Sequence, residues 1–267
     1  MVGIGLFMTM RGNRTKTLLR QGKTVIGCWL EEVRTPAITH LLAAAGLDFL
    51  IVDMEHGAYN METMADIVRM ARLVEITPIV RVPDLTWERV GRILDAGAQG
   101  LMLPRVETPD QVRNFMAYLK YPPAGRRGMA SGLGNTDFRW VTTPEYIAHA
   151  NEETLVIIQI ENSTAVANLT GLAQVPGVDV FFIGPEDLSI SMGFAGQQGH
   201  PQVQETISQI IATTRQHNIA PGIHTSDLAA IGPLHEQGVR FIAYASDIEF
   251  IYNGAAQGAQ TLKESQP

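Results

Sequence analysis

The stretches DFLIVD (48–53), TLVIIQIE (154–161) and VDVFFIG (178–184) decide the fold of this chain. Each is a short, nearly continuous apolar run in which polar and apolar residues do not alternate. Both faces of such a strand must be covered, which is typical of a parallel sheet backed by helices. The three runs therefore predict an α/β protein.

The same unit is repeated from Thr24 onward: an apolar run, a polar loop, and a longer segment with helical periodicity. Eight runs are predicted to be strands, at residues 24–30, 48–53, 77–82, 100–104, 155–160, 178–183, 220–223 and 241–245. Helices are predicted at residues 36–45, 61–73, 87–95, 110–119, 203–217 and 227–237. Eight parallel strands in 267 residues favour a single closed (β/α)8 TIM barrel over an open doubly wound sheet.

Residues 1–22 are expected to form an N-terminal arm with a short helix, and residues 23–267 the barrel domain. The first ten residues, MVGIGLFMTM, are apolar, but they lack the basic start and the cleavage site of a signal peptide. No apolar run approaches the roughly 20 residues that span a bilayer. The stretch 121–150 is expected to be a long loop, rich in turn formers at YPPAGRRGMASGLG (121–134), and loops of this length are often functional.

The composition excludes several classes of protein. The formal net charge is −7, and the basic residues form no run longer than pairs such as Arg126-Arg127, so neither nucleic acid nor a membrane is an expected partner. Cys28 is the single cysteine, which rules out an intrachain disulfide and a cysteine metal cluster. Nothing demands an oxidising compartment. We expect a cytoplasmic protein that binds small molecules.

Polar side chains stand at the carboxyl ends of the predicted strands, where barrels of this class carry their reactive groups. Because all these ends meet at one rim, the side chains should converge there. They are Asp53, Glu55 and His56 after the second strand, Arg81 on the third, Gln159 and Glu161 on the fifth, Gly184, Pro185, Glu186 and Asp187 after the sixth, and His224 on the seventh.

Glu161 and Asp187 are candidate metal ligands. Each follows a strongly apolar strand, so two hard oxygen ligands would face each other across the barrel mouth, a setting that suits Mg²⁺ or Mn²⁺ completed by water and substrate. From spacing alone, each carboxylate could instead cap the helix behind it.

His56 and Arg81 are candidates for the chemistry itself. A carboxylate close to His56 would fix its tautomer and raise its basicity for general-base work, although a loop histidine can equally have a structural hydrogen bond. Arg81 could bind a carboxylate or polarise a keto oxygen, or it could be an ion-pair partner. The Gly184-Pro185 turn could present backbone N–H groups to a substrate carboxylate.

Taken together, these residues resemble the HpcH/HpaI family of class II pyruvate aldolases, of the 4-hydroxy-2-oxoheptanedioate or 2-keto-3-deoxy-sugar-acid type. The resemblance runs from about residue 27 to residue 251. It rests on GCWL (27–30), DMEHG (53–57), VRVP (80–83), LDAGAQG (94–100), YPPAGRRG (121–128), IQIEN (158–162) and IGPEDLSISMG (183–193). Members of this family are (β/α)8 barrels that cleave 4-hydroxy-2-oxo acids to pyruvate and an aldehyde.

The resemblance implies a role for each matching residue. Glu161 and Asp187 would hold a divalent cation, Mg²⁺, Mn²⁺ or Co²⁺, and His56 would be the acid–base group. Arg81 would contact the 2-keto oxygen. Asp53 and Asp95 are similar to the carboxylates that support the histidine, and the sequence does not decide which one bonds it. The remaining substrate contacts would be Trp29, Ser131, Gln159, Gly184, Pro185, Glu186 and His224.

The reaction implied by the resemblance passes through a pyruvate enolate held on the metal. The predicted rim contains no lysine, in agreement with a route without a Schiff base. His224 stands where family members often carry an apolar residue, which favours an aldehyde with a hydroxyl or carboxylate group. The family also implies a homohexamer with an exchanged last helix, in residues 247–262, and a role in aromatic or sugar-acid catabolism. A citryl- or malyl-CoA-type lyase and a non-catalytic binding barrel remain as alternatives.

Overall fold

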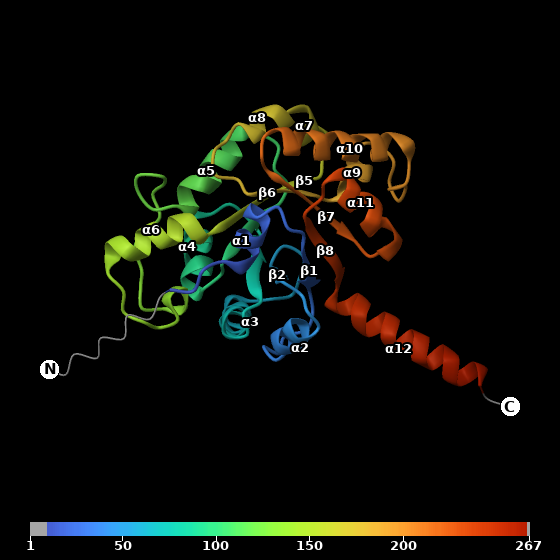
Figure 1. Ribbon diagram of the computed structural model, residues 1–267, viewed down its shortest axis with the longest axis horizontal. Coiled ribbons are helices and arrows are strands. Elements are labelled where there is room, and N and C mark those ends of the chain that lie inside the picture. Colours follow the sequence, from blue (N-terminus) through green and yellow to red (C-terminus); the bar gives the residue numbers. More distant parts are fainter. Residues whose placement is uncertain (1–9, 266–267) are drawn as a thin grey trace.

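Eight parallel strands form a closed barrel in sequence order in the computed structural model, which describes residues 10–265 (Figure 1). Every strand pairs with its sequence neighbours, and β1 closes the barrel against β8. The strands are β1 Val25–Leu30, β2 Phe49–Asp53, β3 Thr77–Arg81, β4 Gly100–Leu103, β5 Leu155–Ile160, β6 Val180–Ile183, β7 Ala220–Thr225 and β8 Phe241–Ser246. The predicted (β/α)8 barrel is confirmed, and each predicted run overlaps one strand.

Helices and short 3₁₀ turns connect the strands around the outside of the barrel (Figure 1). They are α2 Ile38–Ala44, α3 Met61–Leu73, α4 Trp87–Ala96, α5 Pro109–Leu119, η1 Gly134–Thr136, α6 Thr143–Glu153, α7 Ser163–Ala167, α8 Leu169–Ala173, α9 Pro185–Ser191, α10 Pro201–Gln216, η2 Leu228–Ala230 and α11 Ile231–Gln237, and α12 Asp247–Glu264 follows the last strand. Their apolar faces and the outer faces of the strands make the larger of two main core clusters.

The inside of the barrel is filled by side chains from alternate strand positions, as the pleat requires. Phe49 and Phe241 stack there with their ring centroids 4.0 Å apart. Gly27 makes room for them, because a Cβ at this position would lie 2.3 Å from the Phe49 ring. The packed interior is therefore not a channel, and a ligand can enter only at an end of the barrel.

Helix α1 (Arg14–Arg20) covers the amino-terminal end of the barrel. The hydroxyl of Thr15 lies 2.8 Å from that of Thr77, the first residue of β3. Lys16 donates to the carboxylate of Asp179, just before β6, over 2.9 Å. Leu18 and Leu19 pack against the inner cluster. The carboxyl-terminal end is left for a site. Residues 1–9 of the expected N-terminal arm lie outside the described residues.

The long loop predicted for residues 121–150 was wrong in its last part. Helix α6 begins at Thr143, where Thr142 occupies the N-cap position and Pro144 stands in the first turn. Proline favours this position because its missing N–H would be unpaired there anyway. The irregular part, residues 121–142, packs along α4: Gly134 lies so close that a Cβ would be 2.0 Å from the Ala96 carbonyl oxygen.

Helix α12 extends away from the barrel as a long arm (Figure 1). Asp247 anchors its start, because its carboxylate accepts hydrogen bonds from the backbone N–H groups of Glu31, Glu32 and Val33. From Ile251 onward every described residue of the helix is exposed. No helix among residues 10–265 has the length and apolar character needed to cross a membrane.

Candidate active site

The carboxyl-terminal mouth of the barrel brings together most of the residues predicted from the sequence. Strand alternation places the side chains of Trp29, Asp53, Arg81, Gln159 and His224 on the same inward face as the core residues below them. Trp29, Asp53, Arg81 and Gln159 are buried. The ends of β1, β2, β3, β5 and β7 therefore each supply one polar or aromatic group to the same mouth of the barrel.

Asp53 and Arg81 form a buried bidentate ion pair on adjacent strands. Arg81 donates from Nε to Asp53 Oδ1 over 2.9 Å and from Nη2 to Oδ2 over 2.6 Å. Burial alone would raise the pKa of Asp53, but the hydrogen bonds and the charge of Arg81 outweigh it and hold the pKa below its ordinary value. Asp53 Oδ1 also accepts from the backbone N–H groups of Glu55 and His56, so it fixes the loop after β2.

Glu55 connects three groups at the mouth. Its carboxylate lies 3.2 Å from Arg81 Nη1, 2.7 Å from Arg105 Nε and 3.9 Å from His56 Nε2. The side chain of Glu55 is only 6% exposed, whereas the ring of His56 is 61% exposed and can meet a substrate. The role of Glu55 was not predicted. Its signal was available, because it stands beside the histidine in the DMEHG segment.

Glu161 directly follows β5, and one of its carboxylate oxygens is held by the protein. Oε1 accepts a hydrogen bond of 2.6 Å from the backbone N–H of Arg105. Burial, together with the nearby charges of Asp187 and Glu55, raises the pKa of Glu161 to about 7 against the opposing effect of that hydrogen bond. The carboxylates of Glu161, Asp187 and Glu55 thus bring more negative charge to the mouth than the nearby Arg81 neutralises around Glu161.

Gly184 keeps space open beside Glu161. A Cβ at Gly184 would lie 3.0 Å from Glu161 Oε2 and 3.1 Å from Gln159 Nε2. The Oε1 atom of Gln159 is buried and has no hydrogen-bond partner within the described chain. Asp187 is exposed in the first turn of α9. Carboxylate and amide oxygens of this kind are the ligands that a hard cation prefers.

The described residues contain no cluster of three or more histidine, cysteine, aspartate or glutamate side chains arranged to bind a metal by themselves. Two carboxylates would therefore need water or substrate to complete the coordination of a cation.

Trp29 lies between Arg81 and His224. The Arg81 guanidinium carbon is 4.5 Å from the centroid of the Trp29 ring, and Trp29 Nε1 is 3.1 Å from His224 Nδ1. The indole N–H can only donate, so in this contact Nδ1 accepts and the proton of the neutral imidazole resides on Nε2. Burial lowers the pKa of His224, which favours this neutral form. The alternative tautomer would donate to the Ala243 carbonyl oxygen, 3.1 Å away.

Gly184, Pro185 and Glu186 form the start of α9 at the same mouth. Gly184 and Pro185 are buried, and Gly184 occupies the N-cap position. Glu186 is exposed and accepts a hydrogen bond from the side chain of Gln198. It is thus directed to the loop that precedes α10.

One predicted residue, Asp95, does not lie at the mouth within the chain. Asp95 is near the end of α4 and accepts a hydrogen bond of 2.7 Å from Arg127. Burial raises the pKa of Asp95 despite the opposing charge of Arg127. Ser131 belongs to the irregular segment along α4. Helices return from the mouth toward the amino-terminal end, which explains the position of Asp95. Of Asp53 and Asp95, only Asp53 contacts the His56 segment within one chain, and it does so through the backbone; the carboxylate near the His56 ring is that of Glu55.

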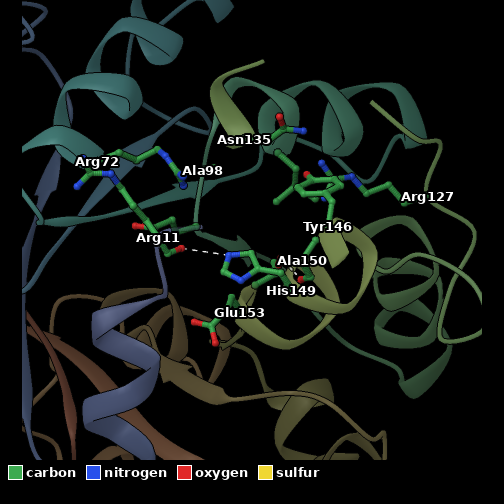
Figure 2. Close-up of a pocket in the computed structure, with 12 residues that line it drawn as sticks. Arg11, Arg72, Ala98, Arg127, Asn135, Tyr146, His149, Ala150 and Glu153 are labelled. Carbon is green, nitrogen blue, oxygen red and sulfur yellow. Dashed lines mark hydrogen bonds between the residues drawn. The ribbon is translucent and has the colours of Figure 1, made fainter. Parts of the chain in front are cut away.

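A small polar pocket lies next to the irregular segment of residues 121–142, and Figure 2 shows the residues that line it. His149 Nε2 lies 3.1 Å from the carbonyl oxygen of Arg11, and Arg72, Arg127 and Tyr146 complete much of the wall. Its volume is about 40 Å³, which is enough for one or a few water molecules. The pocket is too small for a metabolite, and its lining includes none of the residues gathered at the barrel mouth.

Comparisons with known proteins agree with this fold and show the family to which the chain is similar. Residues 25–254 match the family described as HpcH/HpaI aldolase/citrate lyase. A 4-hydroxy-2-oxo-heptane-1,7-dioate aldolase of Salmonella typhimurium is 38% identical over 243 residues, which cover 91% of this chain and 92% of that protein.

Solved structures are similar over nearly the whole chain. The HpcH/HpaI aldolase from Desulfitobacterium hafniense DCB-2 has a TM-score of 0.91 at 34% identity, covering 94% of this chain and 97% of the other. The citrate synthase SbnG has a TM-score of 0.84 at 30% identity, covering 93% and 97%.

Proposed function

The chain belongs to the HpcH/HpaI aldolase/citrate lyase family, and on this premise we propose that it is a metal-dependent aldolase. It cleaves 4-hydroxy-2-oxo acids reversibly to pyruvate and an aldehyde. The observation that carries the proposal is the arrangement of two carboxylates, Glu161 and Asp187, with the buried guanidinium of Arg81 at one barrel mouth. Such a site can hold a keto acid and stabilise the charge that forms on it.

A divalent cation, Mg²⁺, Mn²⁺ or Co²⁺, fits the donor set. Glu161 Oε2 has no hydrogen bond within residues 10–265, Gln159 Oε1 is unpaired, and Gly184 leaves the neighbouring space open. The pKa of Glu161 is raised first by burial and then by the negative charges of Asp187 and Glu55, and a bound cation would offset those charges. Glu161 and Asp187 would hold the metal, whose Lewis acidity would promote electron withdrawal from the keto acid.

Arg81 would bind the 2-keto oxygen of the substrate and stabilise its negative charge in the enolate of pyruvate. Its orientation is fixed by Asp53 and Glu55, so the guanidinium does not have to be ordered again during the reaction. The Trp29 ring packs against its face. Gln159, Gly184 and Pro185 line the side of the site next to Glu161.

His56 would move the protons. It would remove the proton of the 4-hydroxyl group as the bond between C3 and C4 breaks, and a proton would then return to C3 of the enolate. Histidine suits this work because imidazole can take up and release protons near neutral pH. The exposed ring can approach the substrate, while the backbone of its loop is held by Asp53.

The acceptor is proposed to be an aldehyde that carries a polar group. The neutral imidazole of His224 would present Nε2–H as a hydrogen-bond donor at the mouth. The Salmonella relatives are named as aldolases of a seven-carbon dioate. Both points favour an aldehyde with a hydroxyl or carboxylate group over a plain aliphatic one.

A second candidate activity keeps the site and changes the substrate. The similarity to a citrate synthase, and the description of the family as aldolase/citrate lyase, favour carbon–carbon bond chemistry on citrate or on a CoA ester such as citryl- or malyl-CoA. The described chain contributes little beyond the barrel with which to hold a CoA group. The aldolase therefore stands first.

The protein is further proposed to assemble as a homohexamer in the cytoplasm, with α12 exchanged between subunits. Ile251, Tyr252 and Leu262 are large apolar side chains that are more than half exposed on this arm, and a second copy of the chain is the partner that would bury them. Replacing Ile251 with Asp should reduce the mass measured by light scattering, and an unchanged mass would exclude this role for α12.

The activity is tested by measuring pyruvate release from a panel of 4-hydroxy-2-oxo acids, coupled to lactate dehydrogenase. The protein is first treated with EDTA and then supplied with Mg²⁺, Mn²⁺ or Co²⁺. We expect activity to vanish with the chelator and return with metal, and to be lost in the Glu161→Gln variant under every metal. Turnover of CoA esters or citrate alone would support the second candidate, and no turnover of any substrate would support a non-catalytic barrel.

A further inference from the structure

Arg105 occupies an unusual position beside the proposed metal ligands. It comes two residues after β4 and has a φ of 54°, a left-handed conformation that is uncommon for residues other than glycine. Backbone conformations of this kind are concentrated at functional sites. In this conformation the Arg105 N–H donates to Glu161 Oε1 over 2.6 Å. The backbone of Arg105 therefore belongs to the site, and its side chain starts there.

The side chain of Arg105 is bound at one edge only. Nε lies 2.7 Å from Glu55 Oε1, and the side chain is 73% exposed. The two terminal Nη atoms have no hydrogen bond among the described residues, in which Glu55 is the one carboxylate paired with this side chain. Glu55 keeps the guanidinium at the mouth while the Nη edge remains free to bind a ligand.

The two arginines around Glu55 differ in what they can bind. Arg81 is buried, and two carboxylates, Asp53 and Glu55, already bind its guanidinium. Arg105 is paired with Glu55 alone. An anionic group that approaches from solvent would therefore meet the Nη edge of Arg105 before it met Arg81.

We propose that Arg105 selects aldehydes that carry a carboxylate, by binding that group at the outer edge of the site. The inference rests on the proposed aldolase function. If the pyruvate half is held at Glu161 and Arg81, the aldehyde half extends outward past Arg105. The planar fork of a guanidinium offers two parallel donors that match a carboxylate.

His224 cannot supply this selectivity by itself. Its ring is held against Trp29, and its lowered pKa favours the neutral form. A neutral donor bonds a hydroxyl group about as readily as it bonds a carboxylate, so it distinguishes poorly between them. A preference for a negatively charged aldehyde would therefore come from Arg105.

The test compares two aldehydes of nearly the same size in aldol addition to pyruvate. Succinic semialdehyde carries a carboxylate where butanal has a methyl group. The measured quantity is the ratio of kcat/KM for the charged aldehyde to that for the neutral one. In Arg105→Gln we expect this ratio to fall by at least about tenfold, mainly because KM for the charged aldehyde increases. Arg105→Lys should retain part of the ratio, because it keeps the charge but not the fork.

Arg113→Gln is the matched control. Arg113 is an exposed arginine of α5 that pairs with Asp110, so the variant makes the same change in net charge away from the mouth. Its ratio should equal that of the unmodified enzyme. The backbone contact of Arg105 with Glu161 does not involve the side chain, so Arg105→Gln retains that bond.

The outcomes separate this inference from the function on which it rests. The unmodified enzyme could add pyruvate to aldehydes while Arg105→Gln lowers kcat/KM for the charged and the neutral aldehyde by the same factor. In that case Arg105 only positions Glu55, and the selectivity proposal is overturned while the aldolase function stands. If the unmodified enzyme adds pyruvate to no aldehyde with any of the three metals, both proposals are overturned.

Discussion

Asp53 and Arg81 face each other on β2 and β3 as a fully paired, buried ion pair, with bonds of 2.9 and 2.6 Å. Strand register alone puts them together, because Asp53 is the direct partner of Arg81 in the β2–β3 ladder. The pair fixes the guanidinium that is proposed to bind the keto oxygen. Its integrity should therefore affect both stability and catalysis.

Asp53→Asn is expected to lower kcat/KM for pyruvate release by about 100-fold, since a misplaced catalytic group typically costs about that much. It should also lower the free energy of unfolding by about 3–5 kcal/mol, because it leaves a buried arginine without its charged partner. Urea unfolding and steady-state kinetics measure the two effects. Asp110→Asn, which breaks an exposed pair with Arg113, is the control and should change stability by less than about 1 kcal/mol.

Gly184→Ala tests whether the space beside Glu161 is used by a cation. The new Cβ would lie 3.0 Å from Glu161 Oε2 and would force that carboxylate to move. We expect the affinity for Mn²⁺, measured by calorimetry, to fall about 10- to 100-fold. Gly199→Ala is the matched control, because no atom lies within 4 Å of a Cβ at Gly199. Equal affinities in the two variants would mean that the space at Gly184 is not part of the metal site.

Much of the fold was predictable because the inner strands are covered on both faces. Runs such as residues 155–160 have no polar residue at alternate positions until Gln159, and this pattern admits few structures other than a buried parallel strand. The predictions were weaker for segments whose path is determined by tertiary packing and not by local sequence. The residues around Gly134 read as a loop, yet their path is set by close packing on Ala96, which no local pattern reveals.

The candidate site was predictable to the extent that it is built from strand ends. Position at the end of a strand was enough to bring Arg81, Glu161 and His224 to one mouth. Asp95 belongs to a helix, and its position depends on its pairing with Arg127, which the sequence does not show. Arg105 was missed as a functional residue because its role depends on contacts across strands, whereas Glu55 was placed at the rim beside His56 but was given no role of its own.

The raised pKa of Glu161 predicts how the stability of the metal-free protein depends on pH. The folded pKa is about 7 and the ordinary value is 4.5, so between these values the folded state binds more protons than the unfolded state. Stability from this group is therefore present below about pH 4.5 and is lost as the pH rises to about 7, by at most about 3 kcal/mol.

Urea unfolding of the EDTA-treated protein at pH 5.0 and pH 7.5 measures this loss. Glu161→Gln cannot titrate and should lose less stability over the same interval, which separates Glu161 from all other groups. Added Mn²⁺ should restore stability at the higher pH by mass action. The assignment of the raised pKa to Glu161 is wrong if the glutamine variant and the unmodified chain show the same difference between the two pH values.

His224→Leu should change which aldehydes are used without abolishing the reaction. The substitution removes the Nε2–H donor and fills the same place with an apolar side chain. The value of kcat/KM should therefore fall more for hydroxylated aldehydes than for aliphatic ones. The ratio of kcat/KM for glycolaldehyde to that for propanal is expected to fall by about 10-fold, the usual scale for one lost hydrogen bond to a neutral group. His40→Leu, on the exposed side of α2, controls for the loss of a histidine. If the ratio stays constant in His224→Leu while the enzyme remains active, His224 supports Trp29 through its hydrogen bond and does not contact the aldehyde.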